Sequence, residues 1–263
     1  MKDRYIRNFK KLKVETWMSG MGCVELLIFL QWFFLNRVIE VDPPKIGSAC
    51  DFALNQEVVL TSFDNPHGPG CVFGPIESLL PEDLALTLEP LKPGNTASVQ
   101  EKREAYAAIQ RELRLYFDRN PDILLKGPCL IHGGDREMCH VYPQEQKNRK
   151  GLRKDPQASD SDSEEELFLS VAGVDCTDTT RNGFQKGSGG ASRFSHIVWG
   201  AIQRHLRRGL VCGECTEDWL PIDVADELDG YDNERSCVSA FDSGDPYNRR
   251  RSMFSGCKGD TVC

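Results

Sequence analysis

Strand-like and helix-like segments alternate over residues 1–60, and this alternation limits the possible folds more than any other feature of the sequence. Residues 14–18 have the pattern of a short strand, a glycine turn follows them, and residues 24–35 form an apolar segment typical of a buried helix. Residues 38–42 are again strand-like and end in an acid. Parallel strands need a crossover connection, and a helix between two strands provides it. The sequence therefore predicts an α/β fold with a mainly parallel sheet.

The rest of the chain repeats these signals around a long polar interruption. We expect a second helix at 46–55, strands at 71–74, 167–174 and 209–214, a loop at 81–95, and helices at 99–119 and 193–206. One face of the helix at 99–119 is apolar and is expected to pack on the core through Tyr106, Ile109, Leu113 and Phe117. Residues 144–166 have a basic half and an acidic half with almost no large apolar side chains, so we expect a disordered insert there. After Asp223 the sequence predicts no regular element.

The composition narrows the range of partners and compartments. The net charge is −8, which argues against a protein whose whole surface binds nucleic acid. The apolar run at 26–35 is much shorter than the roughly 20 residues that span a bilayer, so we expect no membrane association. The 11 cysteines are an odd number and we find no secretory signal. Reduced thiols inside the cell are therefore expected, rather than a disulfide framework.

Four segments place chemically useful side chains at strand ends. Residues 18–23, MSGMGC, either let a ligand approach the backbone at a helix N-terminus or form an ordinary tight turn. Glu40 suits ribose hydroxyls in nucleotide-binding folds, and a solvated acid is the simpler interpretation. Cys176 follows a predicted strand and is either an exposed nucleophile or a buried thiol. Glu214 ends the next predicted strand, a position from which a carboxylate can face a site.

In their order along the chain these segments resemble the motifs of the cytosine-5 DNA methyltransferase family. The family's glycine motif, ribose acid, nucleophilic cysteine and ENV-type glutamate are matched by "SGMG", "IEVDPPKIGSACDFALN", "GVDCTDTTRNG" and "GECTEDW". "CVFGPIESLLP" resembles the adenine-contacting segment of the family and "NRRRSMF" its arginine motif. The resemblance covers most of residues 15–254 and leaves the middle insert unmatched. It implies a Rossmann-like class I methyltransferase fold that binds S-adenosylmethionine.

The resemblance also implies a role for individual residues. Cys176 would attack C6 of a flipped cytosine as a thiolate, and Glu214 would hold or protonate N3. C5 would then take the methyl group of S-adenosylmethionine. Arg251, with Arg249, would orient the cysteine loop and the base. The implied cofactor contacts are Ser19, Gly20, Met21, Gly22, Glu40 and Glu77.

A division of the chain follows from this resemblance. We expect a basic segment at 1–13, a cofactor-binding half at 14–143, the charged insert at 144–166, a catalytic half at 167–254, and a tail at 255–263. The expected partner is DNA, with RNA as the alternative, and the expected location is the nucleus. The family's target-recognition region has no counterpart after the arginine motif, so a protein partner is expected to supply it.

Two departures from the family pattern favour a different function. Asp175 stands where the family has proline before the cysteine, and an adjacent carboxylate raises the pKa of a thiol. Pro75 stands where the family has an adenine-contacting aspartate. The alternative is a catalytically inactive paralogue or fragment that acts as a nuclear interaction protein through its charged insert.

Two further segments contain residues of the types that bind metal. One is the stretch 129–140, with the candidate ligands Cys129, His132, Cys139 and His140. Their spacing is irregular, so free thiols and surface histidines are the preferred interpretation and we assign no metal site. The other is Cys212-x-x-Cys215, which lacks a matching second pair. His205, on an apolar helical stripe, is expected to pack in the core rather than to bind a ligand.

Overall fold

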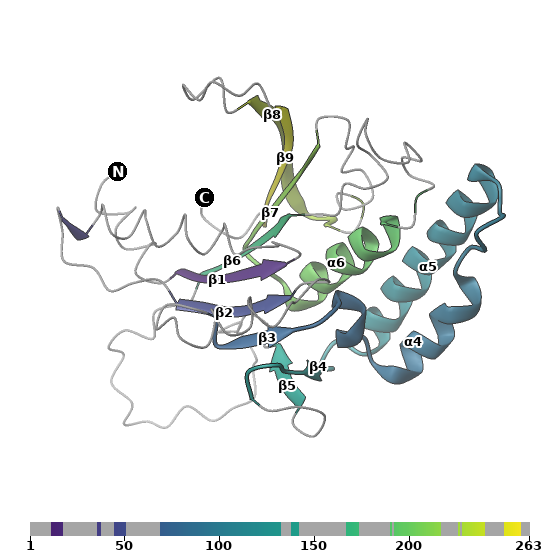
Figure 1. Ribbon diagram of the computed structural model, residues 1–263, viewed down its shortest axis with the longest axis horizontal. Helices are drawn as coiled ribbons and strands as arrows, with labels where there is room; N and C mark the ends of the chain where they lie inside the picture. Colours follow the sequence, from purple (N-terminus) through teal and green to yellow (C-terminus); the bar gives the residue numbers. More distant parts are fainter. Residues whose placement is uncertain are drawn as a thin grey trace.

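A seven-stranded sheet forms the centre of the computed structural model (Figure 1). The structure describes residues 12–17, 36–37, 45–50, 69–132, 138–141, 167–173, 190, 192–216, 226, 228–239 and 250–258. In spatial order the strands are β3 (Cys71–Phe73), β2 (Lys45–Cys50), β1 (Leu12–Trp17), β6 (Leu167–Gly173), β7 (Leu210–Thr216), β9 (Arg250–Lys258) and β8 (Tyr231–Ser239). From β3 to β7 all neighbours are parallel, and β9 runs antiparallel between β7 and β8. This order confirms the predicted α/β fold with a mainly parallel sheet.

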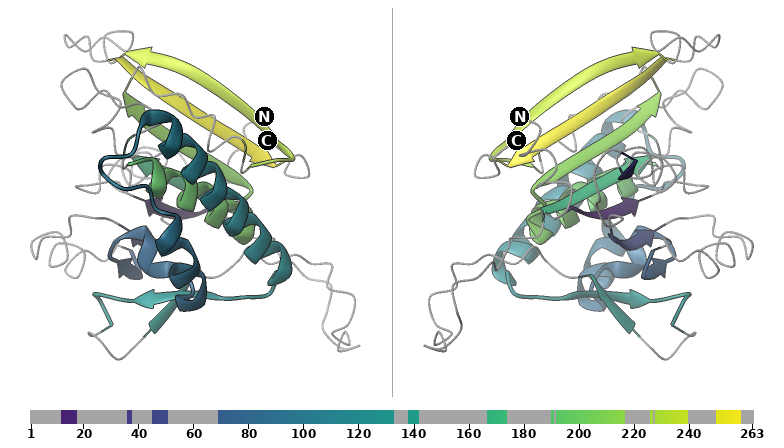
Figure 2. Two further views of the ribbon diagram at one scale, coloured as in Figure 1. Left: turned by 90° about the vertical axis from the view of Figure 1, so that its right-hand side faces the viewer. Right: turned by 90° about the vertical axis from the view of Figure 1, so that its left-hand side faces the viewer.

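Three helices lie together on one side of this sheet, as Figures 1 and 2 show. They are α4 (Glu82–Leu88), α5 (Val99–Arg119) and α6 (Arg193–Leu206). α6 contacts both α5 and the 3-10 turn η1 (Ile76–Leu79), and most of its side chains are buried. A second 3-10 turn, η2 (Glu89–Leu91), follows α4 directly. None of the helices in the described part of the chain is long and apolar enough to cross a membrane.

The elements with clear periodicity are where the sequence predicts them. α5 and α6 have the predicted bounds, and the four apolar residues expected on the inner face of α5 are all buried. α5 begins with a capping box in which Ser98 Oγ accepts from the Glu101 N–H at 3.2 Å and Glu101 accepts from the Ser98 N–H at 2.6 Å. The predicted strands at 14–18, 71–74, 167–174 and 209–214 correspond to β1, β3, β6 and β7. The strand predicted at 38–42 and the insert at 144–166 lie outside the described residues.

Three predictions of secondary structure are wrong. The predicted loop at 81–95 contains α4, because Pro81 is tolerated at a helix start and Leu84 and Leu88 bury one face. The predicted helix at 46–55 begins as β2, whose small side chains carry no strong periodicity but whose backbone pairs with both β1 and β3. The polar region after Asp223 contains β8 and β9. β8 is an edge strand with exposed side chains from Asp232 to Cys237, so it lacks the hydrophobic alternation that predicts a strand.

A buried ion pair links β1 to the segment before β7. The guanidinium of Arg208 donates from Nε to Oε2 of Glu15 at 2.7 Å and from Nη2 to Oε1 at 2.5 Å. The same guanidinium lies 4.3 Å from the centroid of the Phe168 ring. Because both charged groups are desolvated together and joined by two hydrogen bonds, each offsets the burial cost of the other.

A short ribbon of two antiparallel strands lies beside the β3 edge of the sheet (Figure 1). It consists of β4 (Leu125–Pro128) and β5 (Met138–Val141), and a single bridge between Phe73 and Cys129 connects it to β3. The Leu130 N–H donates to the Val72 carbonyl at 2.8 Å. At Gly127 a Cβ atom would lie 2.7 Å from Cδ2 of Leu79, so only glycine allows this close approach to η1.

Candidate functional site

The carboxyl ends of the parallel strands meet at one edge of the sheet, which is where open α/β sheets bind ligands. β1 ends there at Trp17, β6 at Gly173 and β7 at Thr216. Seven of the predicted site residues lie outside the described residues and stay predictions: Ser19, Gly20, Met21, Gly22, Glu40, Cys176 and Arg249. Three of the predicted site residues are described, and two of them form an ion pair.

Glu214 and Arg251 form this pair near the end of β7. In the strand register Glu214 lies opposite Met253 and Thr216 opposite Arg251, so the two side chains reach each other diagonally across the β7–β9 pair. Arg251 Nε donates to Oε1 of Glu214, and 39% of the glutamate side chain and 21% of the arginine side chain remain exposed. The carboxylate is therefore held in place and charge-balanced while it stays accessible to a ligand.

The register also places the end of β6 beside this carboxylate. Gly173 is the residue of β6 that pairs with Glu214, and Cys176 follows Gly173 by three positions. Three residues of chain span at most about 11 Å. The chain segment that leads to Cys176 thus leaves the sheet next to Glu214.

Glu77, the third described site residue, lies in η1, just beyond the end of β3. Its Oε1 atom accepts a hydrogen bond from Ser195 Oγ of α6 at 2.6 Å. Its Oε2 atom is buried and has no hydrogen-bond partner among the described residues. Pro75, two positions earlier, is exposed and precedes the turn. Glu77 Oε2 and the neighbouring Ser78 Oγ are thus two buried acceptors of η1 that have no hydrogen-bond partner among the described residues.

The cysteines of β7 do not form a pair. Residues three apart in a strand point to opposite faces, and Cys215 is buried while Cys212 is half-buried. Cys212 and Glu214 share the more exposed face, as strand geometry predicts, and burial raises the pKa of the Cys212 thiol. Seven of the described cysteines form no disulfide, and Cys257 is the described cysteine that does. The partner of Cys257 lies outside the described residues.

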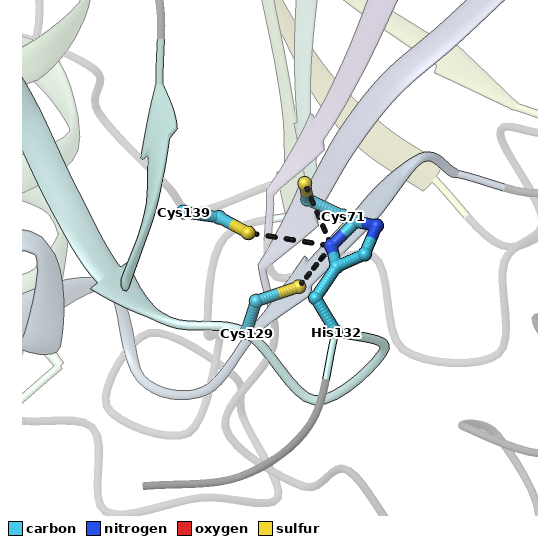
Figure 3. A group of neighbouring side chains, drawn as sticks. All are labelled: Cys71, Cys129, His132 and Cys139. Atoms are coloured by element: carbon cyan, nitrogen blue, oxygen red, sulfur yellow. Dashed lines mark hydrogen bonds between the residues drawn. The ribbon is translucent and has the colours of Figure 1, made fainter. Parts of the chain in front are cut away.

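A second group of chemically active side chains lies where the β4–β5 ribbon meets β3. Figure 3 shows the sulfur atoms of Cys71, Cys129 and Cys139 directed at Nδ1 of His132. The distances from Nδ1 are 3.7 Å to Cys71 Sγ, 3.4 Å to Cys129 Sγ and 3.3 Å to Cys139 Sγ. All four ligand atoms lie within 4.8 Å of one another. We refer to these four residues as the Cys3His cluster.

The Cys3His cluster differs from the set of candidate ligands in the sequence by one residue. His140 is replaced by Cys71, because Cys139 and His140 are successive residues of β5 and their side chains point to opposite faces. Cys71 is the first residue of β3 and lies 58 positions before Cys129. No local spacing connects the two, so Cys71 could not be recognised as a member from the sequence pattern.

The thiols of the cluster perturb one another. Burial, together with negative charge at Cys129, raises the pKa of Cys71 to about 12. Burial acts in the same direction on Cys129, but hydrogen bonds at the backbone of His132 and Val72 outweigh it and lower the pKa of Cys129 to about 7. One thiolate in this group therefore disfavours the next unless a positive charge joins them.

We assign no functional site to His205 or to a hollow beside α5. His205 is half-buried; its ring stacks on Phe117 with ring centroids 4.5 Å apart, and its Nε2 lies 2.8 Å from the Ile123 carbonyl, so it packs against the edge of the core. A hollow of about 550 Å³ lies between α5 and the start of β8, with Arg111 and Tyr231 in its lining. It lies at the edge of the sheet opposite to the carboxyl ends of the parallel strands, and no predicted site residue lines it.

Comparisons with known proteins find matches among solved structures alone. No model of a known family matches the chain, and no curated protein matches it. One similar structure is a protein assigned as a DNA modification methyltransferase, encoded within a prophage of E. coli; its TM-score is 0.43 and its identity 14%, over 94% of this chain and 47% of that chain. Another is the S. pombe Dnmt2 methyltransferase, with a TM-score of 0.43 and 12% identity, over 96% of this chain and 51% of that chain. The chain spans about half the length of these two structures.

Proposed function

We propose that the chain is an S-adenosylmethionine-dependent methyltransferase-like protein that acts on C5 of cytosine in a nucleic acid. One observation carries the proposal: an accessible carboxylate, Glu214, is held by Arg251 at the carboxyl end of β7, beside the residue where β6 ends. The fold by itself does not decide an activity, because the same sheet hosts many reactions. Glu214 lies beside Gly173, the last residue of β6, which precedes Cys176 by three positions in the sequence, and this is what favours cytosine chemistry.

In the proposed reaction the chain supplies a nucleophile and a proton donor on the two sides of one base. The Cys176 thiolate forms a bond to C6 of a cytosine that has been turned out of its stack. Glu214 holds the base at N3 or, in its protonated form, delivers a proton there, so that negative charge leaves the ring. Arg251 keeps the Glu214 side chain in one orientation across the β7–β9 pair. The cysteine leaves again when a base removes the C5 proton after methylation.

S-adenosylmethionine supplies the electrophilic methyl group. The described residue that we propose for contact with this cofactor is Glu77, whose Oε2 has no partner among the described residues and can accept from an amino group. The other proposed contacts of S-adenosylmethionine are Ser19, Gly20, Met21 and Gly22 of the glycine motif, and Glu40, which is proposed to bind the ribose hydroxyls. The proposed partner is DNA, with RNA as the alternative; nuclear location and a protein partner for target recognition follow from that choice and are part of the same proposal.

The test is covalent trapping. The full chain is incubated with S-adenosylmethionine and a duplex that carries 5-fluorocytosine, where fluorine at C5 blocks release of the cysteine. We expect an adduct that survives denaturation and maps to the peptide of Cys176, and we expect Cys176→Ser to abolish it. Cys237→Ser is the matched control, because Cys237 is an exposed free thiol of β8. Binding of S-adenosylmethionine is measured in parallel by calorimetry.

The two readouts separate the proposed enzyme from the inactive paralogue. Heat of binding together with an adduct supports the enzyme. Heat of binding without an adduct favours the inactive paralogue that Asp175 and Pro75 suggest. Absence of both overturns the proposed function and leaves the fold unaffected.

A further inference from the structure

The Cys3His cluster has the composition and the shape of a closed metal site. Its ligand atoms come from three segments: the start of β3, the turn after β4, and β5. Three sulfurs and one imidazole nitrogen are a donor set that selects Zn²⁺ over the oxygen-preferring ions. We propose that Cys71, Cys129, His132 and Cys139 bind one structural Zn²⁺ ion in tetrahedral coordination.

The observed distances agree with a zinc ion at the centre of the four atoms. With Zn–S bonds of about 2.3 Å and a Zn–N bond of about 2.05 Å, a tetrahedron has S···N edges of about 3.6 Å. The three S···N distances in the cluster are 3.3, 3.4 and 3.7 Å. A regular tetrahedron also has S···S edges of about 3.8 Å. Because all four ligand atoms lie within 4.8 Å of one another, the sulfur separations have to shorten by about 1 Å at most to reach this spacing.

Hydrogen bonding within the cluster does not explain its geometry. The Nδ1 atom of a neutral imidazole has either one N–H or one lone pair, so it makes one good hydrogen bond. Three sulfur atoms nevertheless surround the Nδ1 atom of His132 at similar distances (Figure 3). A cation at the centre satisfies all four atoms together, since each thiolate and the lone pair then point to the same charge.

The ion would attach the β4–β5 ribbon to the sheet. The two strands of the ribbon have four residues each, and a two-stranded sheet of that size is marginal in water without further support. Its backbone connections to β3 include the Phe73–Cys129 bridge and the hydrogen bond from Leu130 to Val72. Four protein ligands leave no open coordination position for a substrate, so the role assigned to the ion is structural rather than catalytic. This inference does not depend on the proposed function.

The first test measures metal content of the full chain purified without chelator. We expect about one zinc ion per chain, and Co²⁺ exchanged into the site is expected to give the thiolate charge-transfer bands and strong visible bands of a tetrahedral site. Cys71→Ser is expected to reduce the zinc content to near zero. His140→Ala is the matched control, because His140 is the neighbour of Cys139 that the geometry excludes, and it is expected to keep the metal.

The second test keeps the inference falsifiable if Cys71→Ser fails to fold. The wild-type chain is alkylated with and without EDTA, and labelling is read by mass spectrometry peptide by peptide. Zinc is expected to slow labelling of Cys71, Cys129 and Cys139 by at least about tenfold, and EDTA to remove this protection, while Cys237 labels equally in both conditions. A metal-free chain whose three cysteines label as fast as Cys237, or a disulfide between any two of the three, would overturn the inference. So would loss of zinc in His140→Ala with zinc retained in Cys71→Ser.

Discussion

Two glutamate–arginine pairs in the same sheet lie in opposite environments. Glu15 and Arg208 are buried within it, with 4% and 0% of their side chains exposed, and two hydrogen bonds of 2.7 and 2.5 Å join them. Glu214 and Arg251 lie near the carboxyl end of β7, with 39% and 21% of their side chains exposed. Solvent and ligands can reach the second pair but not the first.

The difference separates a residue that serves folding from one that is available for chemistry. A buried charge that loses its partner costs several kcal/mol, whereas an exposed pair adds roughly 0–1 kcal/mol to stability. The fold therefore depends on Glu15 and Arg208 and hardly at all on Glu214 and Arg251. Glu214 and Arg251 contribute little to stability but are held in place at the edge where ligands are expected to bind. We therefore expect substitutions of these two residues to change activity rather than folding.

The largest expected effect is the loss of stability in Arg208→Met. The substitution keeps most of the side-chain volume but leaves the Glu15 carboxylate buried without its partner, so the free energy of unfolding should fall by about 3–5 kcal/mol. Urea unfolding followed by circular dichroism measures this loss. Arg251→Met is the comparison, with an expected loss below about 1 kcal/mol.

A double variant tests whether the stability loss in Arg208→Met comes from the unpaired charge or from poor packing of the new side chain. Glu15→Leu combined with Arg208→Met removes both charges, and most of the lost stability should return. Equal losses in Arg208→Met and Arg251→Met would show that the two pairs do not differ as described.

The next effect concerns rate rather than stability. Glu214→Gln removes the proton that the proposed mechanism delivers to N3, so the initial rate of adduct formation with 5-fluorocytosine DNA should fall by about 100-fold. The free energy of unfolding should change by less than about 1 kcal/mol, because the side chain is partly exposed. A stability loss as large as that of Arg208→Met, with an unchanged adduct rate, would assign the edge pair to the fold instead.

The smallest expected effect is a difference in salt dependence. Raising the ionic strength from about 0.1 M to 1 M shortens the Debye length from about 10 Å to about 3 Å. The coupling energy of Glu214 and Arg251, from a double-mutant cycle with Glu214→Gln and Arg251→Met, should be below about 1 kcal/mol and should decrease further in high salt. The coupling of Glu15 and Arg208 should stay nearly constant, because screening ions do not reach a buried pair.

Local patterns in the sequence predicted the elements that bury one continuous apolar face. α5 and α6 have the predicted bounds because their apolar residues recur at helical spacing. β2 and β8 were missed, since the partners on either side hold β2 in place and β8 exposes most of its side chains at the edge of the sheet. Both strands are held in the sheet by backbone hydrogen bonds to their neighbours, which the side-chain pattern does not reveal.

The same limit applies to the sites. The sequence predicted Glu214 and Arg251 as a functional combination through the family resemblance, and they do form a pair, but their catalytic roles stay predictions. It did not predict the Cys3His cluster in its full form, because Cys71 reaches the other ligands only through the folding of β3 against the ribbon. Local sequence spacing could not predict the pairing of Glu15 with Arg208 either, since 193 positions separate the two residues.

That separation has a consequence for the chain while it is being made. At a synthesis rate of about 5–20 residues per second, the 193 positions between Glu15 and Arg208 correspond to about 10–40 s on the ribosome. For most of this interval, until β6 (Leu167–Gly173) has been made, β1 can pair with β2 on one side only, and its other edge, with the carboxylate of Glu15, is unpaired. A charge at such an edge discourages pairing with the edges of other nascent chains. We therefore expect the carboxylate that the finished protein buries to protect the first strand of the sheet from aggregation until β6 has been synthesised.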